Sequence, residues 1–319
     1  MTLFTYRDLW SLDINEPPSF ISPRAIVAAN IDSNSEDEAL LVVGSLSGYL
    51  RIIGAVHGTD KDSDGDYAEI TEQAVVLAEF HLSAPILQVE AERFVGGSDK
   101  MTLAILHPQK LSIFSVSKLP GQVEHGSQYK LSLLYEHQLK RHAFNMCSGP
   151  FGRGASESNA DRSKGMKDAR QFLCVQSLDG TLSFFEQEVF TFSRYIPDIL
   201  LPGQICYVPA WDSFIIAASW NLVCFKYASL AMAKDDVYQQ QHQDSTVGKK
   251  LTPDWVVSIG EECLGEIQVL GTEDSSTTRV IVCTFRHIFC FGEAAELMWC
   301  KKLEYQISSF CSYVVRKLF

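Results

Sequence analysis

Three aspartates at alternate positions carry the strongest chemical pattern in this sequence. Asp60, Asp62 and Asp64 precede Gly65, as in the first half of a calcium-binding loop, where alternating carboxylates wrap a hard cation. The twelfth loop position should be a bidentate glutamate, but Thr71 stands there, and no helical pattern flanks the loop. We therefore predict a solvated acidic loop here and keep a calcium-binding module as the alternative.

Two pairs of adjacent residues have the types for acid–base chemistry. Glu136 stands beside His137, and Glu261 stands beside Glu262. Glycoside hydrolases work with a pair of carboxylates, but nothing in the sequence supplies the further arginine and carboxylate set that such a site needs. A hydrolase is the least favoured alternative, and we predict a protein that is not an enzyme.

The thiols and imidazoles show no ligand spacing. Cys283 and Cys290 flank one apolar hairpin, where two core thiols are expected. The Walker loop, the dinucleotide glycine pattern, His-Glu-x-x-His and Cys-x-x-Cys are all missing. We predict no catalytic, cofactor-binding or metal residue and no cofactor. The eight histidines are expected to be solvated groups at turns, strand ends or inserts: His57, His81, His107, His125, His137, His142, His242 and His287.

A repeated hairpin is the element that must position all of these residues. In residues 171–185 two apolar runs flank Asp179-Gly180, a strong hairpin signal because glycine takes positive φ without a steric penalty. The same shape recurs around turns at 47–48, 107–110, 220–221 and 286–287. Trp220 and Phe285 in these turns are expected to pack rather than to recognise a ligand.

The spacing of the hairpins predicts an all-β fold, a β-propeller of four-stranded antiparallel blades. Once three polar inserts near 57–70, 152–169 and 234–250 are removed, the repeat is about 40–50 residues, as in propellers. The inserts are predicted to be disordered. A TIM barrel would need helices between the strands, and a β-sandwich would need fewer strands.

The expected strands can be placed in detail. The third repeat should have strands at 144–147, 172–175, 182–185 and 189–195, and the fourth at 204–208, 214–218, 222–225 and 255–259. Outer strands should alternate, with Leu131, Leu133 and Tyr135 on one face. Gly149, before a proline, should form a tight turn between strands. Residues 228–243 should hold a short helix.

The two ends of the chain suggest an incomplete ring. We expect a strand at 3–10 that closes the ring and a lone first strand at 307–315 after five complete blades. The predicted organisation is thus one propeller domain over 1–319, incomplete at its C-terminus.

Composition restricts the partner class. The 319 residues carry a net charge of −12, which argues against nucleic-acid binding. No run of 18 apolar residues and no signal-peptide pattern occurs. Nine scattered cysteines indicate buried free thiols in a reducing compartment.

A family resemblance adds to this interpretation. Arg7-Asp-Leu-Trp-Ser11 and Gln176-Ser-Leu-Asp-Gly180 are similar to the N-terminal region of the family of the ninth Bardet–Biedl syndrome protein, or parathyroid-hormone-responsive protein. Further colinear stretches lie at 43–52, 85–90, 103–107, 110–111, 123–126, 134–137, 185–188, 200–203, 254–255 and 259–261. The match runs from residue 1 to about 305, whereas 312–319 no longer follow the family.

The resemblance implies a function. It implies a seven-bladed propeller and a non-catalytic scaffold subunit of the BBSome, a coat-like complex that moves membrane proteins into and out of cilia. The implied partners are other BBSome subunits, including tetratricopeptide-repeat and propeller-containing ones, with ciliary membrane proteins as indirect cargo. The implied location is the cytoplasm, cilium, basal body and centriolar satellites, peripheral to the ciliary membrane.

Overall fold

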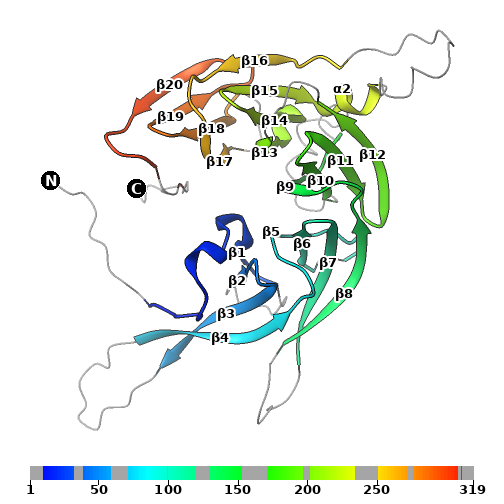
Figure 1. The fold of residues 1–319 in the computed structure, drawn as a ribbon, viewed down its shortest axis with the longest axis vertical. Coiled ribbons are helices and arrows are strands. Elements are labelled where there is room, and N and C mark those ends of the chain that lie inside the picture. The colour runs from blue at the N-terminus through cyan, green and yellow to red at the C-terminus, as the bar shows by residue number, and fades with distance from the viewer. Residues whose placement is uncertain are drawn as a thin grey trace. The chain divides into compact units, whose positions relative to one another are not determined.

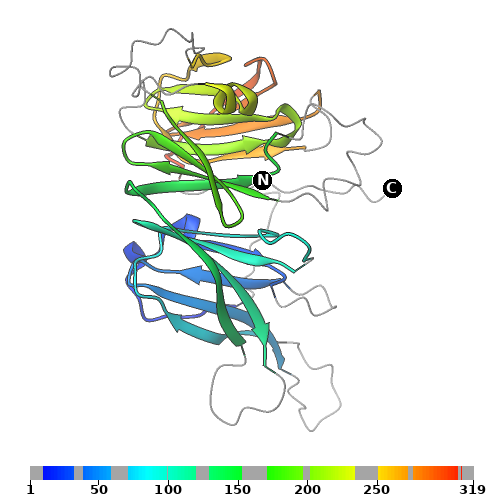
Figure 2. The same cartoon turned by 90° about the vertical axis from the view of Figure 1, so that its right-hand side faces the viewer.

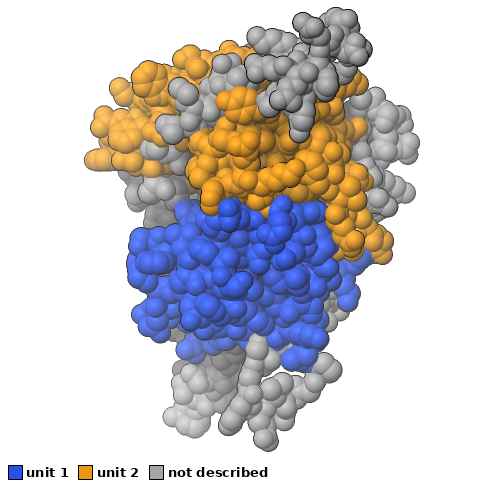
Figure 3. Space-filling model, turned by 45° about the vertical axis from the view of Figure 1, so that its right-hand side comes forward, with its two compact units in different colours: residues 1–94, 98–138 blue, residues 95–97, 139–319 orange. Residues whose placement is uncertain are grey.

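The structure, a computed structural model, describes residues 10–31, 39–58, 71–98, 100–119, 129–152, 171–196, 202–233, 251–271, 276–307 and 310. The chain divides into two compact units, residues 1–94 with 98–138 and residues 95–97 with 139–319 (Figure 3). We describe each unit by itself. Five antiparallel sheets of four strands each account for all twenty strands in the described ranges.

Unit 1 contains two of these sheets (Figure 1). Two 3₁₀ turns, η1 (Pro18–Phe20) and η2 (Pro23–Ala25), lead into the first strand. Sheet 1 comprises β1 (Ile26–Ala29), β2 (Leu40–Gly44), β3 (Tyr49–Gly58) and β4 (Thr71–His81), and sheet 2 comprises β5 (Gln88–Glu92), β6 (Thr102–His107), β7 (Lys110–Lys118) and β8 (Tyr129–Gln138).

Unit 2 contains the other three sheets. Sheet 3 comprises β9 (Ala143–Gly149), β10 (Phe172–Ser177), β11 (Thr181–Glu186) and β12 (Val189–Tyr195). Sheet 4 comprises β13 (Pro202–Val208), β14 (Ser213–Ala218), β15 (Asn221–Lys226) and β16 (Trp255–Ser258), with η3 (Pro209–Trp211) and α2 (Tyr227–Met232) in its connections. Sheet 5 comprises β17 (Cys263–Leu270), β18 (Arg279–Thr284), β19 (His287–Phe291) and β20 (Leu297–Lys302).

The middle strands carry apolar residues on both faces, and residues on both faces are buried. Every residue of β6 and of β14 is buried. In unit 1 one cluster joins Val42 and Leu50 of sheet 1 to Leu103 and Ile105 of sheet 2. In unit 2 the corresponding cluster is aromatic and gathers around Phe151, whose ring lies 4.7 Å from Tyr207 and 4.8 Å from Phe214. Packing of this kind removes several hundred square ångströms of apolar surface from water and supplies most of the stability.

Within each unit, the first strand of one sheet lies beside the first strand of the next. Strand β1 contacts β5 in unit 1, and β13 contacts both β9 and β17 in unit 2. Figure 2 shows the sheets of each unit from the side of their outer strands. Strands β9 and β13 run parallel, since Asn145 near the start of one donates to Gly203 O near the start of the other, and Gly152 N, just beyond the end of β9, donates to Asp212 Oδ1, beyond the end of β13. Consecutive four-stranded sheets with adjacent first strands are propeller blades. The predicted all-β propeller fold is therefore confirmed, and the TIM barrel and two-sheet sandwich are excluded.

Most expected strands of sheets 3 and 4 appear within two residues of their predicted bounds. The predicted alternation of β8 is wrong, because a bulge opposite Ile113 and Phe114 shifts the register. Leu133 and its neighbour Leu134 are consequently both exposed.

The predicted role of Gly149 as a turn is also wrong. It is the last residue of β9 and pairs with Phe172, so it lies inside the sheet. A glycine is needed there because the ring of Tyr207 approaches its Cα closely.

Several predictions fall partly or wholly outside the described residues. The short helix is confirmed over Tyr227–Met232, but the rest of 228–243 is almost entirely undescribed. The insert cores at 59–70, 153–169 and 234–250, residues 3–9 of the expected closing strand and most of 307–315 lie outside as well. Disorder in the inserts, ring closure and a seven-bladed ring stay predictions.

Candidate interaction surface at the hairpin-turn ends

We define the hairpin-turn end of a sheet as the end that carries the turn between its second and third strands. These turns are residues 45–48, 108–109, 178–180, 219–220 and 285–286 in sheets 1 to 5. Backbone hydrogen bonds tie them to the segments that connect successive sheets. Leu46 N donates to Phe20 O at 2.7 Å, Leu178 N donates to His142 O at 2.8 Å, and Trp220 O accepts from Ile259 N at 2.8 Å. The turn of sheet 5 is tied in the same way, since Leu303 N donates to Arg286 O at 2.7 Å. These four turns are therefore held on a rigid base.

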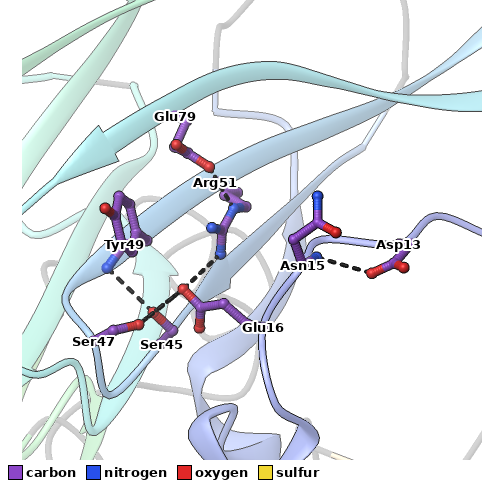
Figure 4. Close-up of polar contacts among 8 residues, drawn as sticks. All are labelled: Asp13, Asn15, Glu16, Ser45, Ser47, Tyr49, Arg51 and Glu79. Carbon is purple, nitrogen blue, oxygen red and sulfur yellow. Dashed lines mark hydrogen bonds and ion pairs between the residues drawn. The ribbon is translucent and has the colours of Figure 1, made fainter.

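A buried ion-pair network stabilises the hairpin-turn end of sheet 1 (Figure 4). Arg51 on β3 is almost fully buried, and its Nε donates to Glu79 Oε2 at 2.6 Å while its Nη1 donates to Glu16 Oε1 at 3.2 Å. Glu16 Oε1 also accepts from Ser47 at 2.8 Å and from Ser45 at 3.2 Å. The network fixes the segment before β1 against the turn of the first hairpin.

Opposing effects set the pKa of the Glu16 carboxyl. Burial alone would raise it, but hydrogen bonds from Ser47, Ser45 and Arg51, together with the Arg51 charge, hold the pKa below its ordinary value. Glu16 is therefore charged at neutral pH and matches the guanidinium of Arg51. Sequence reasoning did not find this pair, because nothing in the pattern of residues links two positions 35 apart in a loop and a strand.

Sheet 5 has a related carboxylate at its hairpin-turn end. Glu261, in the segment before β17, accepts from the Thr284 hydroxyl at 2.6 Å, from Arg286 N at 3.1 Å and lies 2.8 Å from His287 Nδ1. Burial would raise its pKa, but these donors lower it below its ordinary value. The carboxylate clamps the hairpin, while the adjacent Glu262 is exposed. The carboxylates of Glu261 and Glu262 therefore do not form the acid–base pair that their adjacency in sequence suggests.

Glu136 and His137, the other candidate acid–base pair, are also separated. Glu136 is exposed on β8 and lies 3.6 Å from Lys110 Nζ, whereas His137 is buried with its ring 5.7 Å from that of Tyr135. Successive strand residues point to opposite faces, which explains the separation. No shared site can form from these two side chains.

The expectation that turn histidines are solvated is confirmed for some and wrong for others. His81 and His142 are exposed. His107 is buried, with its Nδ1 2.8 Å from Pro85 O, and burial lowers its pKa. His137 is also buried. The side chains of His57, His125 and His242 lie outside the described part of the chain.

The cysteines behave as core thiols. All eight described cysteines are free, and six of them are buried. Cys283 pairs across the strands with Ile288 and Cys290 with Ile281, so the two sulfurs are not direct cross-strand partners. Burial raises the pKa of Cys283 to about 11. Across the described ranges no cluster of three or more His, Cys, Asp or Glu could hold a metal, and Asp60, Asp62 and Asp64 lie outside those ranges.

Each of the three hairpin turns of unit 2 carries an exposed apolar side chain. Trp220 is 66% exposed, Leu178 53% and Phe285 42%, and each comes from a different sheet. The expectation that Trp220 and Phe285 pack is therefore wrong, because two-residue turns lift their side chains beyond the neighbouring strands. The Arg286 guanidinium stands 5.9 Å from the Phe285 ring centre, a cation–π arrangement.

Leu178, Trp220 and Phe285, which we call the apolar tips, lie at one end of unit 2. Strands β9 and β13 run parallel, and Trp255 Nε1 donates to Glu293 O, which joins the opposite ends of sheets 4 and 5. Two of the three side chains, Trp220 and Phe285, are aromatic, and exposed aromatic residues on ordered turns are typical of the residues that contribute most binding energy in protein interfaces.

Comparison with known proteins places this geometry in context. The PTHB1 N-terminal family matches residues 1–318. Protein PTHB1 of Xenopus laevis is 39% identical over 316 residues, which are 98% of this chain and 34% of that protein. The human Protein PTHB1 is 37% identical over the same length, covering 98% of this chain and 33% of that protein. The chain thus spans about a third of the length of the curated relatives it matches.

Solved structures show the fold. Chaetomium thermophilum Raptor aligns with a TM-score of 0.52 at 13% identity, over 95% of this chain and 22% of that chain. A structure of BBS1N in complex with ARL6DN gives a TM-score of 0.49 at 12% identity, over 95% and 89% of the two chains. Similarity at this level concerns the fold alone, and no partner follows from it. In the described part of the chain no helix has the length and apolar character of a membrane span.

Proposed function

Because the chain belongs to the PTHB1 N-terminal family, we propose that it is a non-catalytic scaffold subunit of the BBSome, a coat-like complex that carries membrane proteins into and out of cilia. Family membership over residues 1–318 is the observation that carries the proposal. The partners we propose are other BBSome subunits, including tetratricopeptide-repeat and propeller-containing ones. Ciliary membrane proteins are indirect cargo.

The hairpin-turn end supports a binding role. The apolar tips Leu178, Trp220 and Phe285 are exposed, yet the turns that carry them are held by backbone hydrogen bonds. Because these turns are already ordered, they lose less conformational entropy when a partner binds. We therefore assign the apolar tips as a contact region for a BBSome subunit.

The polar groups that suggested catalysis support a structural assignment instead. Glu261 receives hydrogen bonds from Thr284 and Arg286 N and pairs with His287, and Glu136 and His137 point to opposite faces. Each group thus has a role in holding a strand or a hairpin.

Affinity capture from ciliated cells tests this proposal. The tagged chain should enrich named BBSome subunits, quantified by mass spectrometry, with the full-length Xenopus laevis relative as positive control. The triple variant Leu178→Ser, Trp220→Ser, Phe285→Ser should lose at least about tenfold of that enrichment, since each buried anchor contributes about 1–2 kcal/mol.

The matched control replaces three equally exposed apolar residues on outer strands, Leu133→Ser, Val189→Ser and Val256→Ser. This control should capture the subunits as the wild type does, and all variants should melt within a few degrees of it. Absence of every BBSome subunit from the wild-type capture, while the positive control succeeds, would refute the scaffold role for this chain. Equal loss in both triple variants would refute the assignment of the apolar tips.

We also propose that the chain resides in the cytoplasm, the cilium, the basal body and the centriolar satellites, peripheral to the ciliary membrane. Its net charge of −12 and its family membership are compatible with recruitment through a complex. Imaging of a fluorescent fusion should show co-localisation with a BBSome subunit at the ciliary base. Uniform cytosolic signal in cells whose BBSome is intact would contradict this location.

A further inference from the structure

Strand β20 is the outer strand of sheet 5 and is exposed along its whole length. Among the described strands it pairs with β19 alone, so its other edge presents unpaired backbone N–H and C=O groups. All six residues from Leu297 to Lys302 are exposed. Leu297 is 53%, Met298 43% and Trp299 48% exposed, which makes an apolar centre of three large side chains.

The other outer strands differ from β20. Strand β8 buries Tyr129 and His137, and β4 buries Ala74 and Ala78. Strand β12 half-buries its residues from Phe192 to Arg194, and β16 half-buries alternate residues. Part of each of these strands is therefore engaged in packing, whereas β20 combines a free edge with uncovered side chains.

Opposite charges mark the two ends of β20. Glu293 and Glu296 precede the apolar centre, and Lys301 and Lys302 follow it. Gly292 N donates to Glu296 O at 2.8 Å, which closes the turn between β19 and β20 and fixes the position of the acidic end. The apolar centre is thus flanked by an acidic end and a basic end along one exposed strand.

We propose that β20 accepts an extended segment of a partner protein as a fifth, antiparallel strand of sheet 5. Backbone pairing with an edge strand supplies affinity without sequence preference, while opposite charges across strands set direction and choice of partner. In an antiparallel pair the partner's first residues face Lys301 and Lys302, and its last residues lie beside Glu296, which directly precedes the strand. The partner segment therefore has acidic residues first, apolar residues in its centre and basic residues last.

This surface is distinct from the apolar tips, and the inference holds whether or not the chain assembles with the BBSome. Antiparallel pairing is favoured over parallel pairing because its hydrogen bonds are straighter and slightly stronger per residue. Cys300 adds a chemical probe within the strand, since it is the one exposed thiol among the eight described cysteines.

Synthetic peptides test the proposal by fluorescence anisotropy with the 319-residue chain. The probe Glu-Glu-Val-Thr-Val-Thr-Val-Lys-Lys should bind about tenfold more tightly than the same peptide with its two charged ends exchanged, because the two residues that face Lys301 and Lys302 then become basic and the residues beside Glu296 become acidic. A copy N-methylated at all five central residues, which lacks every central backbone donor, should not bind measurably. The probe should also slow the reaction of Cys300 with a maleimide.

Variants locate the site. Exchange of the strand charges by Glu293→Lys, Glu296→Lys, Lys301→Glu and Lys302→Glu should reverse the preference between the two peptides. The control Val256→Lys, on the outer strand of sheet 4, should leave binding unchanged. Equal binding of both charge orders, binding of the N-methylated copy, no binding of the probe, or unchanged Cys300 reactivity would each overturn the proposal. The maleimide measurement uses the wild-type chain, so it decides the question even if the charge-exchange variant does not fold.

Discussion

Replacement of Gly149 gives the sharpest test of how unit 2 is packed. A Cβ built on Gly149 would lie 2.8 Å from Tyr207 Cε1 and closer still to Cδ1, and 2.9 Å from Phe151 Cε1. Real Cβ contacts are longer, so Gly149→Ala must displace one of these two rings. Both are buried, and their centres are only 4.7 Å apart.

Neither ring has an easy way to move. The Tyr207 hydroxyl donates to Asp212 Oδ1 at 2.7 Å, and burial, with that hydrogen bond, raises the pKa of Tyr207 so that it stays a donor. Phe151 lies against Phe184, Phe214 and Tyr227. Overpacking costs about 2 kcal/mol and weakening of the buried hydrogen bond about 1 kcal/mol, so we expect a loss of about 3 kcal/mol.

Thermal unfolding followed by circular dichroism measures this loss. At about 2–4 °C per kcal/mol, Gly149→Ala should lower Tm by about 6–12 °C. Gly149→Arg should lower it further, because the guanidinium would enter an aromatic cluster without a partner. Gly292→Ala is the matched control: its Cβ would meet Glu296 and Met298 only at 3.6 Å or more, so Tm should change little.

A double variant separates the proposed cause from general damage. Tyr207→Leu alone should destabilise the chain, but adding Gly149→Ala to it should cost less than in the wild type, since the closer of the two obstructing rings is gone and only Phe151 must shift. A Tm for Gly149→Ala within about 1 °C of the wild type would show that the close approach of Tyr207 is not a constraint. Full additivity of the two substitutions would point to the same conclusion.

Three further predictions concern the ion pair of Arg51, the two clamping glutamates and the exposed thiol. Arg51→Met should lower the unfolding free energy, measured in urea, by about 3 kcal/mol, because the Glu16 carboxylate stays buried without its cation. Adding Glu16→Gln to this variant should recover part of the loss, and no recovery would contradict the pairing. In the folded chain the pKa values of Glu16 and Glu261 both lie below the ordinary value of a glutamate, so these carboxylates contribute fully to the free energy of unfolding at neutral pH, and that contribution is lost as pH falls through the folded values. The urea midpoint should therefore drop in that acidic range, and it should drop less steeply in the Glu16→Gln, Glu261→Gln variant. An identical slope in the two proteins would refute the assignment. Of the eight described cysteines, Cys300 should react first with a maleimide at pH 8, as mapped by peptide mass spectrometry, and early labelling of Cys224, whose pKa burial raises to about 12, would contradict the described packing.

The polar clamps show where sequence reasoning stopped. Sequence patterns suggest an acid–base group at Glu261 and a solvated turn residue at His287, but the contact between them depends on the segment before β17 returning to the turn after β18. No local pattern encodes that return. Arg51 gave no signal at all, because a single arginine in a strand does not reveal a carboxylate 35 residues earlier.

Local sequence signals account for the repeated hairpins, the four-stranded blades and the bounds of most strands. These features depend on glycine turns and on apolar runs of strand length, which act between residues close in the chain. Tertiary structure alone decided which turn residues are exposed, why Gly149 must lack a side chain and which strand edge is uncovered. Those outcomes depend on contacts between sheets, and such contacts join residues far apart in the chain whose spacing in sequence carries no record of their distance in space.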